Sequence, residues 1–141
     1  MSKSKPTPGR REIRRFQRAA DARLEEAQFL LANQYTTAAV YLAGYAVECA
    51  LKALILSSEP ASRHEETLLT FRGSKAHDFN WLRRQLGRRR TPVPVPVDVR
   101  LQTAGWWTTE LRYTPRNIEE AEARTFVTTA EELVCWVKGR I

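Results

Sequence analysis

Proton transfer is the chemistry that the rarest side chains of this sequence suggest. The 141 residues include only two histidines, His64 and His77, and four residues separate His77 from Arg72. In that arrangement His77 can act as a general acid and base while Arg72 holds a phosphate and stabilises its developing charge. The alternative is that His77 only caps a helix, because 23 lysines and arginines place a cation near some histidine by chance.

A second set of polar residues interrupts the most apolar stretch of the chain. Glu48 and Lys52 stand four positions apart among alanines and leucines, so on a helix they share one face. These charges can line a nucleotide pocket or a dimer cleft, or they can pair with each other or with Arg112. Tyr41 and Tyr45 can stack on a base or pack in the core.

Runs of arginine predict contact with a polyanion. The formal net charge is +7, and most of the cations are arginines, whose planar fork suits phosphate. The alternative is a pair of solvated helix faces. The candidate nucleic-acid-binding residues are Arg11, Arg14, Arg15, Arg18, Arg83, Arg84, Arg88, Arg89 and Arg90.

Two adjacent tryptophans, Trp106 and Trp107, cannot both point inward from one helix. They therefore form a surface for a partner, or one lies in the core and the other covers a loop.

The periodicity of apolar residues predicts the elements that must position these side chains. It indicates an all-α fold: an up-down bundle of four long helices plus one short helix, in a single domain over residues 10–141, after a disordered lead-in over residues 1–9. A short connection near residues 34–35 makes the first two helices antiparallel neighbours. The first two predicted helices cover residues 10–33 and 36–56, and a loop over 57–75 with a short turn near 65–71 follows them. A short helix is then capped at His77 or Asp78 and stopped by Gly87, and an extended proline stretch covers residues 91–97. The fourth long helix runs from its cap Asp98 to Leu111, and the last helix is capped by Asn117 with Glu120.

Other features exclude several classes of protein. No apolar run reaches about eighteen residues and the N-terminal stretch is polar, so neither a membrane span nor a secretory signal is expected. We expect a cytoplasmic protein in which Cys49 and Cys135 are buried thiols. No metal site is predicted, because His64 and His77 would need distant carboxylates and neither cysteine has a second ligand at metal spacing. No cofactor is predicted, since the glycines do not form a phosphate loop, and no catalytic triad has a recognisable signature.

Four pieces of sequence, in this order, resemble the HEPN domain family. They are the string from Tyr41 to Ala53 with its A-G-Y-A-x-E-x-x-L-K-A pattern, then His77-Asp78-Phe79, then Leu111-Arg112-Tyr113, and last an amphipathic helix that ends near Val137. Phe79 stands where leucine is more usual. The resemblance covers roughly residues 20–139, and it places Tyr45, Glu48, Lys52, Asp78, Arg112 and Tyr113 in a polar pocket or cleft.

The resemblance implies a helical bundle that commonly forms a homodimer. It also implies a minimal nucleotidyltransferase as partner, in toxin–antitoxin or defence pairs. Many such domains are metal-independent ribonucleases that use an arginine closely followed by a histidine near the start of the C-terminal helix. No histidine follows Arg112 or Arg116, so that position is empty in this chain.

Three hypotheses remain. The empty position favours a non-catalytic, dimeric module that binds a nucleotidyltransferase, a nucleotide or RNA. The second hypothesis is a ribonuclease toxin that uses Arg72 and His77. The third is a structural subunit of a larger defence assembly.

Overall fold

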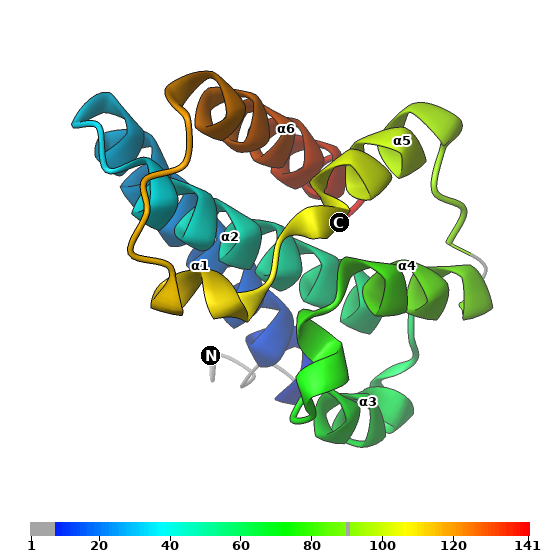
Figure 1. Ribbon diagram of the computed structural model, residues 1–141. Helices are drawn as coiled ribbons and strands as arrows, with labels where there is room; N and C mark the ends of the chain where they lie inside the picture. Colours follow the sequence, from blue (N-terminus) through cyan, green and yellow to red (C-terminus); the bar gives the residue numbers. More distant parts are fainter. Residues whose placement is uncertain (1–7, 90) are drawn as a thin grey trace, which may run out of the picture.

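The computed structural model describes residues 8–89 and 91–141, and over those residues it contains helices and no strand (Figure 1). Four short 3-10 turns, at Ala61–Arg63, Ser74–His77, Ala104–Trp106 and Thr109–Tyr113, lie between the α-helices. The predicted all-α bundle is confirmed. The α-helices are α1 (Pro8–Ala32), α2 (Thr36–Ser57), α3 (His64–Thr70), α4 (Phe79–Arg88), α5 (Val95–Thr103) and α6 (Glu120–Lys138).

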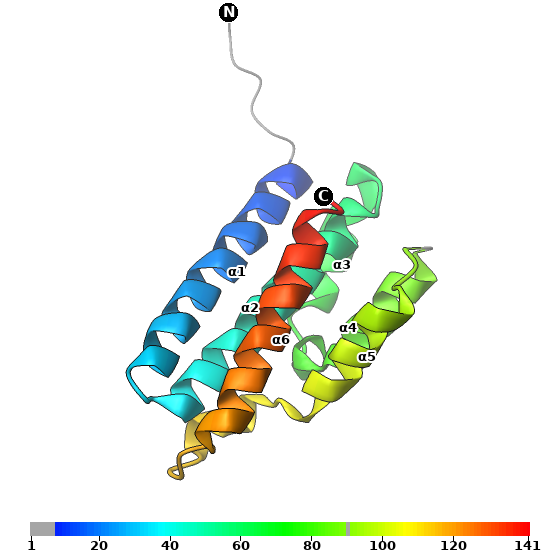
Figure 2. The ribbon, with the colours of Figure 1, turned by 90° about the horizontal axis from the view of Figure 1, so that it is seen from above.

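The central element is α2, against which α1, α4 and α6 all pack (Figures 1 and 2). The alanines at positions 39, 43, 46 and 50 are at most 3% exposed, so neighbouring backbones approach closely. In the described chain, α2 alone has the length and mean hydropathy (1.6) of a membrane span, but 78% of that stretch is buried inside the bundle. Burial on every side is what the core helix of a bundle requires.

The connection between α1 and α2 is as short as predicted. Gln34 adopts a φ of 67°, in the left-handed region. The N–H of Gln34 donates to the carbonyl of Leu31 at 3.1 Å, and the N–H of Tyr35 donates to the carbonyl of Leu30 at 2.9 Å. This Schellman motif ends α1 and turns the chain back on itself, which makes the two helices antiparallel.

The first residues of α2 also hold the segment that leads into α6. The Thr36 hydroxyl donates to the carbonyl of Ile118 at 2.6 Å, and the Thr37 hydroxyl donates to the carbonyl of Arg116 at 2.8 Å. The Thr37 oxygen in turn accepts the N–H of Ile118 at 3.0 Å. The predicted capping box of Asn117 with Glu120 is wrong: α6 begins at Glu120 with no side-chain cap, and threonines of α2 bind the backbone just before it.

The predicted fourth long helix is also wrong. α5 begins at Val95, inside the proline stretch, and ends at Thr103. Pro96 is tolerated there because the first helical N–H groups have no partner in the helix. Residues 104–113 form two 3-10 turns instead of continuing the helix, so three helices are long and three are short.

Three smaller differences from the sequence-based predictions concern the ends of two helices and the exposure of one cysteine. α1 begins at Pro8, so residues 8–9 belong to the helix and not to a lead-in, while residues 1–7 lie outside the described residues. α4 continues through Gly87 to Arg88. Cys49 is partly buried but Cys135 is exposed, because α6 turns it away from the core side of Val134.

Candidate functional site

A buried carboxylate on α2 is the centre of the polar site. Glu48 and Lys52 have side chains only 5% and 7% exposed, and the Lys52 ammonium donates to Glu48 Oε2 at 2.9 Å. The other carboxylate oxygen, Oε1, lies 2.7 Å from Nδ1 of His77. The predicted Glu48–Lys52 pair is therefore confirmed, and it has a third member that the sequence did not indicate. Lys52 also lies 5.3 Å from the ring centroid of Phe71.

The carboxylate fixes the orientation of the imidazole. With Nδ1 against Glu48, the natural tautomer carries its proton on Nδ1 and leaves Nε2 as an acceptor. The His77 side chain is 40% exposed, and Nε2 has no hydrogen bond among residues 8–89 and 91–141. A carboxylate-held imidazole that reaches solvent can transfer protons.

One aromatic ring packs against this imidazole, and a second ring packs against the first. Tyr45 meets His77 edge-on with ring centroids 6.1 Å apart, and Tyr41 meets Tyr45 at 5.0 Å. The Tyr41 hydroxyl lies 3.4 Å from the Tyr45 hydroxyl. Burial, and then the hydrogen bond with Tyr41, raise the pKa of Tyr45 above its ordinary value. Both tyrosines are partly buried and pack against the core, which is closer to the predicted core packing than to a freely exposed base-stacking surface.

Trp107 closes the site from the other side, and sequence reasoning did not find this role. Its indole N–H is shared between the carbonyls of Val40, at 3.1 Å, and Tyr41, at 3.2 Å. The ring stacks on Phe79 with centroids 5.3 Å apart and an interplanar angle of 1°. It lies directly over Gly44, where an added Cβ would come within 2.0 Å of the indole. The signal in the sequence was a lone glycine in an alanine-rich helix, together with the tryptophan pair.

The predicted alternative of one tryptophan in the core and one covering a loop is correct for the core residue only, because the second tryptophan covers a helix. Trp107 is 4% exposed and belongs to the core, whereas Trp106 is 41% exposed. Trp106 packs against Phe126 of α6, with ring centroids 5.1 Å apart.

The remaining predicted pocket residues lie at the edge of the site or outside it. Arg112 and Tyr113 are exposed, and the guanidinium lies 4.8 Å from the Tyr113 ring centroid. Interaction with the Tyr113 and then the Tyr41 hydroxyl raises the pKa of Arg112. Asp78 caps α4 by accepting the N–H groups of Asn80 and Trp81. Capping is therefore done by Asp78 and not by His77.

The structure does not join Arg72 to His77. Arg72 is exposed in the segment after α3, and in the described part of the chain its side chain takes part in no hydrogen bond or ion pair. Nothing in this geometry tests whether the two residues act together, so the catalytic pair stays a prediction.

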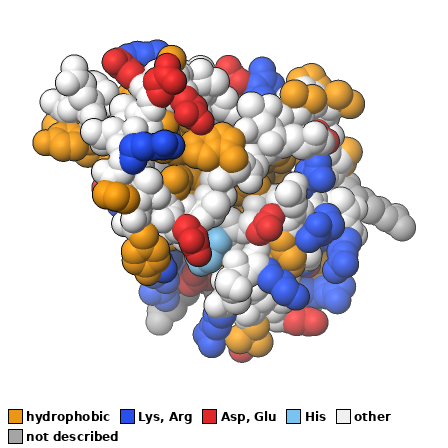
Figure 3. Space-filling model, viewed as in Figure 1, with side chains coloured by type: hydrophobic (Ala, Val, Ile, Leu, Met, Phe, Trp, Pro, Cys, Tyr) orange, Lys and Arg blue, Asp and Glu red, His pale blue; other side chains and the backbone are white. Residues whose placement is uncertain are grey.

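The predicted arginine clusters differ in how many of their side chains form ion pairs with other parts of the protein. Arg83 on α4 pairs with Asp98 at 2.9 Å, and Arg89, directly after α4, pairs with Glu59 at 2.5 Å, so both arginines connect structural elements. Arg84 and Arg88 are exposed, and Arg90 lies outside the described residues. Lys and Arg side chains gather on the α3–α4 side of the face in Figure 3. On α1, the predicted residues Arg11, Arg14, Arg15 and Arg18 are exposed, and within the described chain their one ion pair is a loose contact of Arg15 with Glu12 at 3.9 Å.

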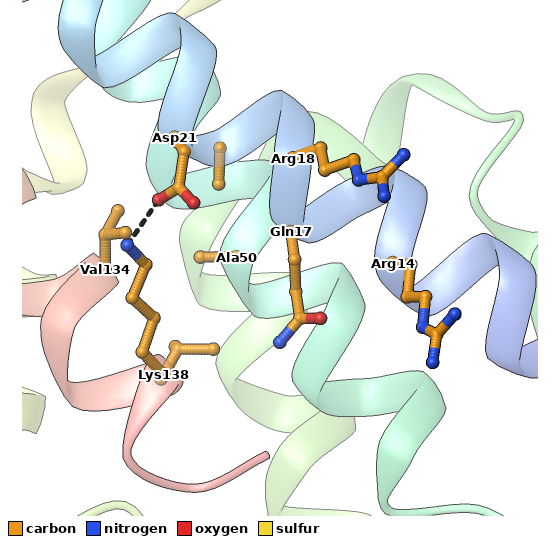
Figure 4. A pocket seen from close by; sticks show the side chains of 9 residues that line it. Arg14, Gln17, Arg18, Asp21, Ala50, Val134 and Lys138 are labelled. Carbon is orange, nitrogen blue, oxygen red and sulfur yellow. Dashed lines mark ion pairs between the residues drawn. The ribbon is translucent and has the colours of Figure 1, made fainter.

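A groove runs between α1, α2 and α6 beside two of these arginines (Figure 4). Its volume is about 370 Å³, and its lining consists of Arg14, Gln17, Arg18, Ala20, Asp21, Ala50, Val134, Val137 and Lys138. Asp21 and Lys138 form an ion pair of 2.6 Å across it. No group of three or more metal-ligating side chains was found over residues 8–89 and 91–141.

Comparison with protein families gives one match. The family model described as HEPN domain matches residues 13–140. No curated protein and no solved structure matches the chain.

Proposed function

The chain belongs to the HEPN domain family, and we propose that it is a nucleic-acid-associated member that acts by binding. In this proposal it works as a homodimer beside a minimal nucleotidyltransferase, in a toxin–antitoxin or defence system of the cytoplasm. HEPN domains are helical modules that are often associated with nucleic acid. The observation that carries the proposal is the arginine face of α1, formed by Arg11, Arg14, Arg15 and Arg18.

The arginines of this face destabilise α1, and the folding of the domain gives no reason for them. Arg11 and Arg15, like Arg14 and Arg18, are like charges four positions apart, a spacing that destabilises a helix. The first turn of α1 contains no acidic residue, although acidic residues there would interact favourably with the helix dipole. Contact with phosphates would turn these repelling charges into a source of affinity.

A function in binding without catalysis agrees with what is found at the two places where a nuclease pair of arginine and histidine could lie. No histidine follows Arg112 before α6, and in the described chain no hydrogen bond joins Arg72 to His77. Both oxygens of the buried Glu48 carboxylate have a partner, and the Lys52–Glu48 ion pair supports a structural role for these two residues of α2.

Salt-dependent binding of single-stranded RNA tests the proposal. We expect the quadruple variant R11Q/R14Q/R15Q/R18Q to bind the RNA at least tenfold more weakly than wild type at low salt. We also expect a shallower salt dependence, because each phosphate contact on a single strand contributes a slope of about 0.7. The matched control R63Q/R116Q/R124Q/R140Q removes four exposed arginines elsewhere and should change affinity less than threefold. Equal losses in both variants would reduce the effect to net charge and contradict the proposal.

The mass of the same samples in solution tests the dimer.

The ribonuclease remains the second candidate, and the Glu48–His77 contact favours it. A carboxylate that holds Nδ1 and leaves Nε2 toward solvent is an arrangement suited to general acid–base catalysis. The test is incubation of wild type, His77→Ala and Glu48→Gln with single-stranded RNA without added metal. Cleavage by wild type that the His77→Ala variant lacks would replace the binding proposal with this one.

A further inference from the structure

We infer that the groove between α1, α2 and α6 binds one phosphate-bearing nucleotide unit, with its phosphate at Arg14 and Arg18. This inference rests on the proposed function and assigns it a place. It also separates the four arginines of the proposed α1 face into two that line the groove, Arg14 and Arg18, and two that do not.

The floor of the groove is apolar and closely packed. Ala50 on α2 and Val134 and Val137 on α6 form it, and each is at most 3% exposed as a residue. The small side chain of Ala50 leaves the depression that larger residues would fill. A volume of about 370 Å³ is at the lower end of the range for small-molecule sites, so it suits one nucleotide and not a duplex.

The two ends of the groove differ in charge. Figure 4 shows the guanidinium groups of Arg14 and Arg18 extending to the end away from the Asp21–Lys138 pair. That pair neutralises itself at 2.6 Å and closes the opposite end. The two guanidinium groups point in different directions in Figure 4, and both side chains are exposed, so a change of rotamer brings both to one phosphate. Each guanidinium then offers a planar fork to the phosphate oxygens.

Between these ends, Gln17 supplies the polar contact that an oriented ligand needs. Its side chain projects from α1 between Arg14 and Asp21 in Figure 4, and that side chain makes no hydrogen bond within the described residues. Its amide can donate and accept at once, as a base edge or a sugar hydroxyl requires. The groove therefore has a cationic end for a phosphate, a polar group in its middle and an apolar floor. This combination fits a nucleotide, either free or within a strand.

Two variants of α1 with equal loss of charge give the test. R14Q/R18Q removes the arginines of the groove, whereas R11Q/R15Q removes two exposed arginines outside its lining. The probes are adenosine 5′-monophosphate, adenosine, inorganic phosphate and a ten-residue oligoadenylate RNA, measured by calorimetry. We expect R14Q/R18Q to weaken binding of the monophosphate and the RNA at least tenfold, and R11Q/R15Q to weaken monophosphate binding less than threefold. Adenosine and phosphate should each bind more weakly than the monophosphate.

The outcomes separate this inference from the proposed function. If RNA binds and both variants weaken it equally, the groove is not a site, although the arginine face stands. If the monophosphate binds through Arg14 and Arg18 but RNA does not, the groove stands for a free nucleotide and the nucleic-acid proposal fails. If RNA alone binds and depends on Arg14 and Arg18, the groove holds a unit of a strand. If no probe binds, both fail.

Discussion

The substitution Gly44→Ala is expected to destabilise the domain, although alanine is the better helix former. An added methyl group would stand 2.0 Å from Cε2 and Nε1 of Trp107. The indole cannot move aside freely, because its N–H is bonded to two carbonyls of α2 and its ring is stacked on Phe79. One methyl group must therefore displace a ring that several contacts hold in place.

The size of the effect follows from two opposing contributions. Replacing glycine by alanine inside a helix stabilises by about 1 kcal/mol. Displacing a core tryptophan approaches the cost of removing it, about 3–5 kcal/mol. Trp107 is 4% exposed, so most of that cost applies. The net expectation is a loss of about 2–4 kcal/mol in the free energy of unfolding.

Urea denaturation followed by circular dichroism measures this loss. The matched control is Gly87→Ala in α4, where an added Cβ meets nothing within 4 Å. That variant should be neutral or stabilised by up to about 1 kcal/mol. A double-mutant cycle with Trp107→Leu gives the coupling, because Gly44→Ala should cost little once the indole is gone.

Either of two results would refute this reasoning. Gly44→Ala alone could prove neutral or stabilising, which would mean that the indole does not rest on the glycine. Alternatively, Gly44→Ala could cost the same with and without Trp107, which would trace the loss to α2 itself.

Three other predictions follow from buried or exposed groups. Lys52→Met should cost about 3–5 kcal/mol by leaving the Glu48 carboxylate short of a partner, and the double variant with Glu48→Gln should recover part of that loss in the same urea assay. Gly9→Ala should weaken the contact of α1 with α3, because the new methyl would come within 1.4 Å of a ring atom of His64; faster amide exchange in the first turn of α1, without change in α6, would show it. Burial raises the pKa of Cys49 to about 11, so its alkylation should be slow at pH 8 and should accelerate about tenfold per pH unit up to that pKa, while exposed Cys135 reacts at once. Mass spectrometry of the labelled peptides reads this out, and equal rates at pH 8 would contradict it.

The long helices were predictable because their apolar stripes persist for many turns. The pair of Glu48 with Lys52 was predictable for a related reason, since four positions on one helix fix their distance before any packing is known. The failures lie where local signals compete. Gly87 reads as a stop but sits in the last turn of α4, and Pro96 reads as extended chain but fits the first turn of α5.

The tertiary parts of the site could not be predicted in this way. His77 is 29 positions from Glu48, and their contact depends on how the turn Ser74–His77 packs on α2. The groove beside Arg14 depends on α6 and α1 packing side by side on α2, which no periodicity encodes. The tight approach of Trp107 to Gly44 is a long-range contact of the same kind.

The turn at Gln34 and the threonines at the start of α2 also bear on how the chain acquires its structure during translation. α1 and α2 are joined by a turn within the helix-ending motif, so this hairpin can form as soon as it leaves the ribosome. The α6 side of α2 stays open much longer, because the carbonyl that Thr36 binds belongs to a residue 82 positions later. Until that segment emerges, the most apolar helix of the protein lacks its cover. A chaperone that binds apolar segments, or a protease, would therefore meet this nascent chain at α2.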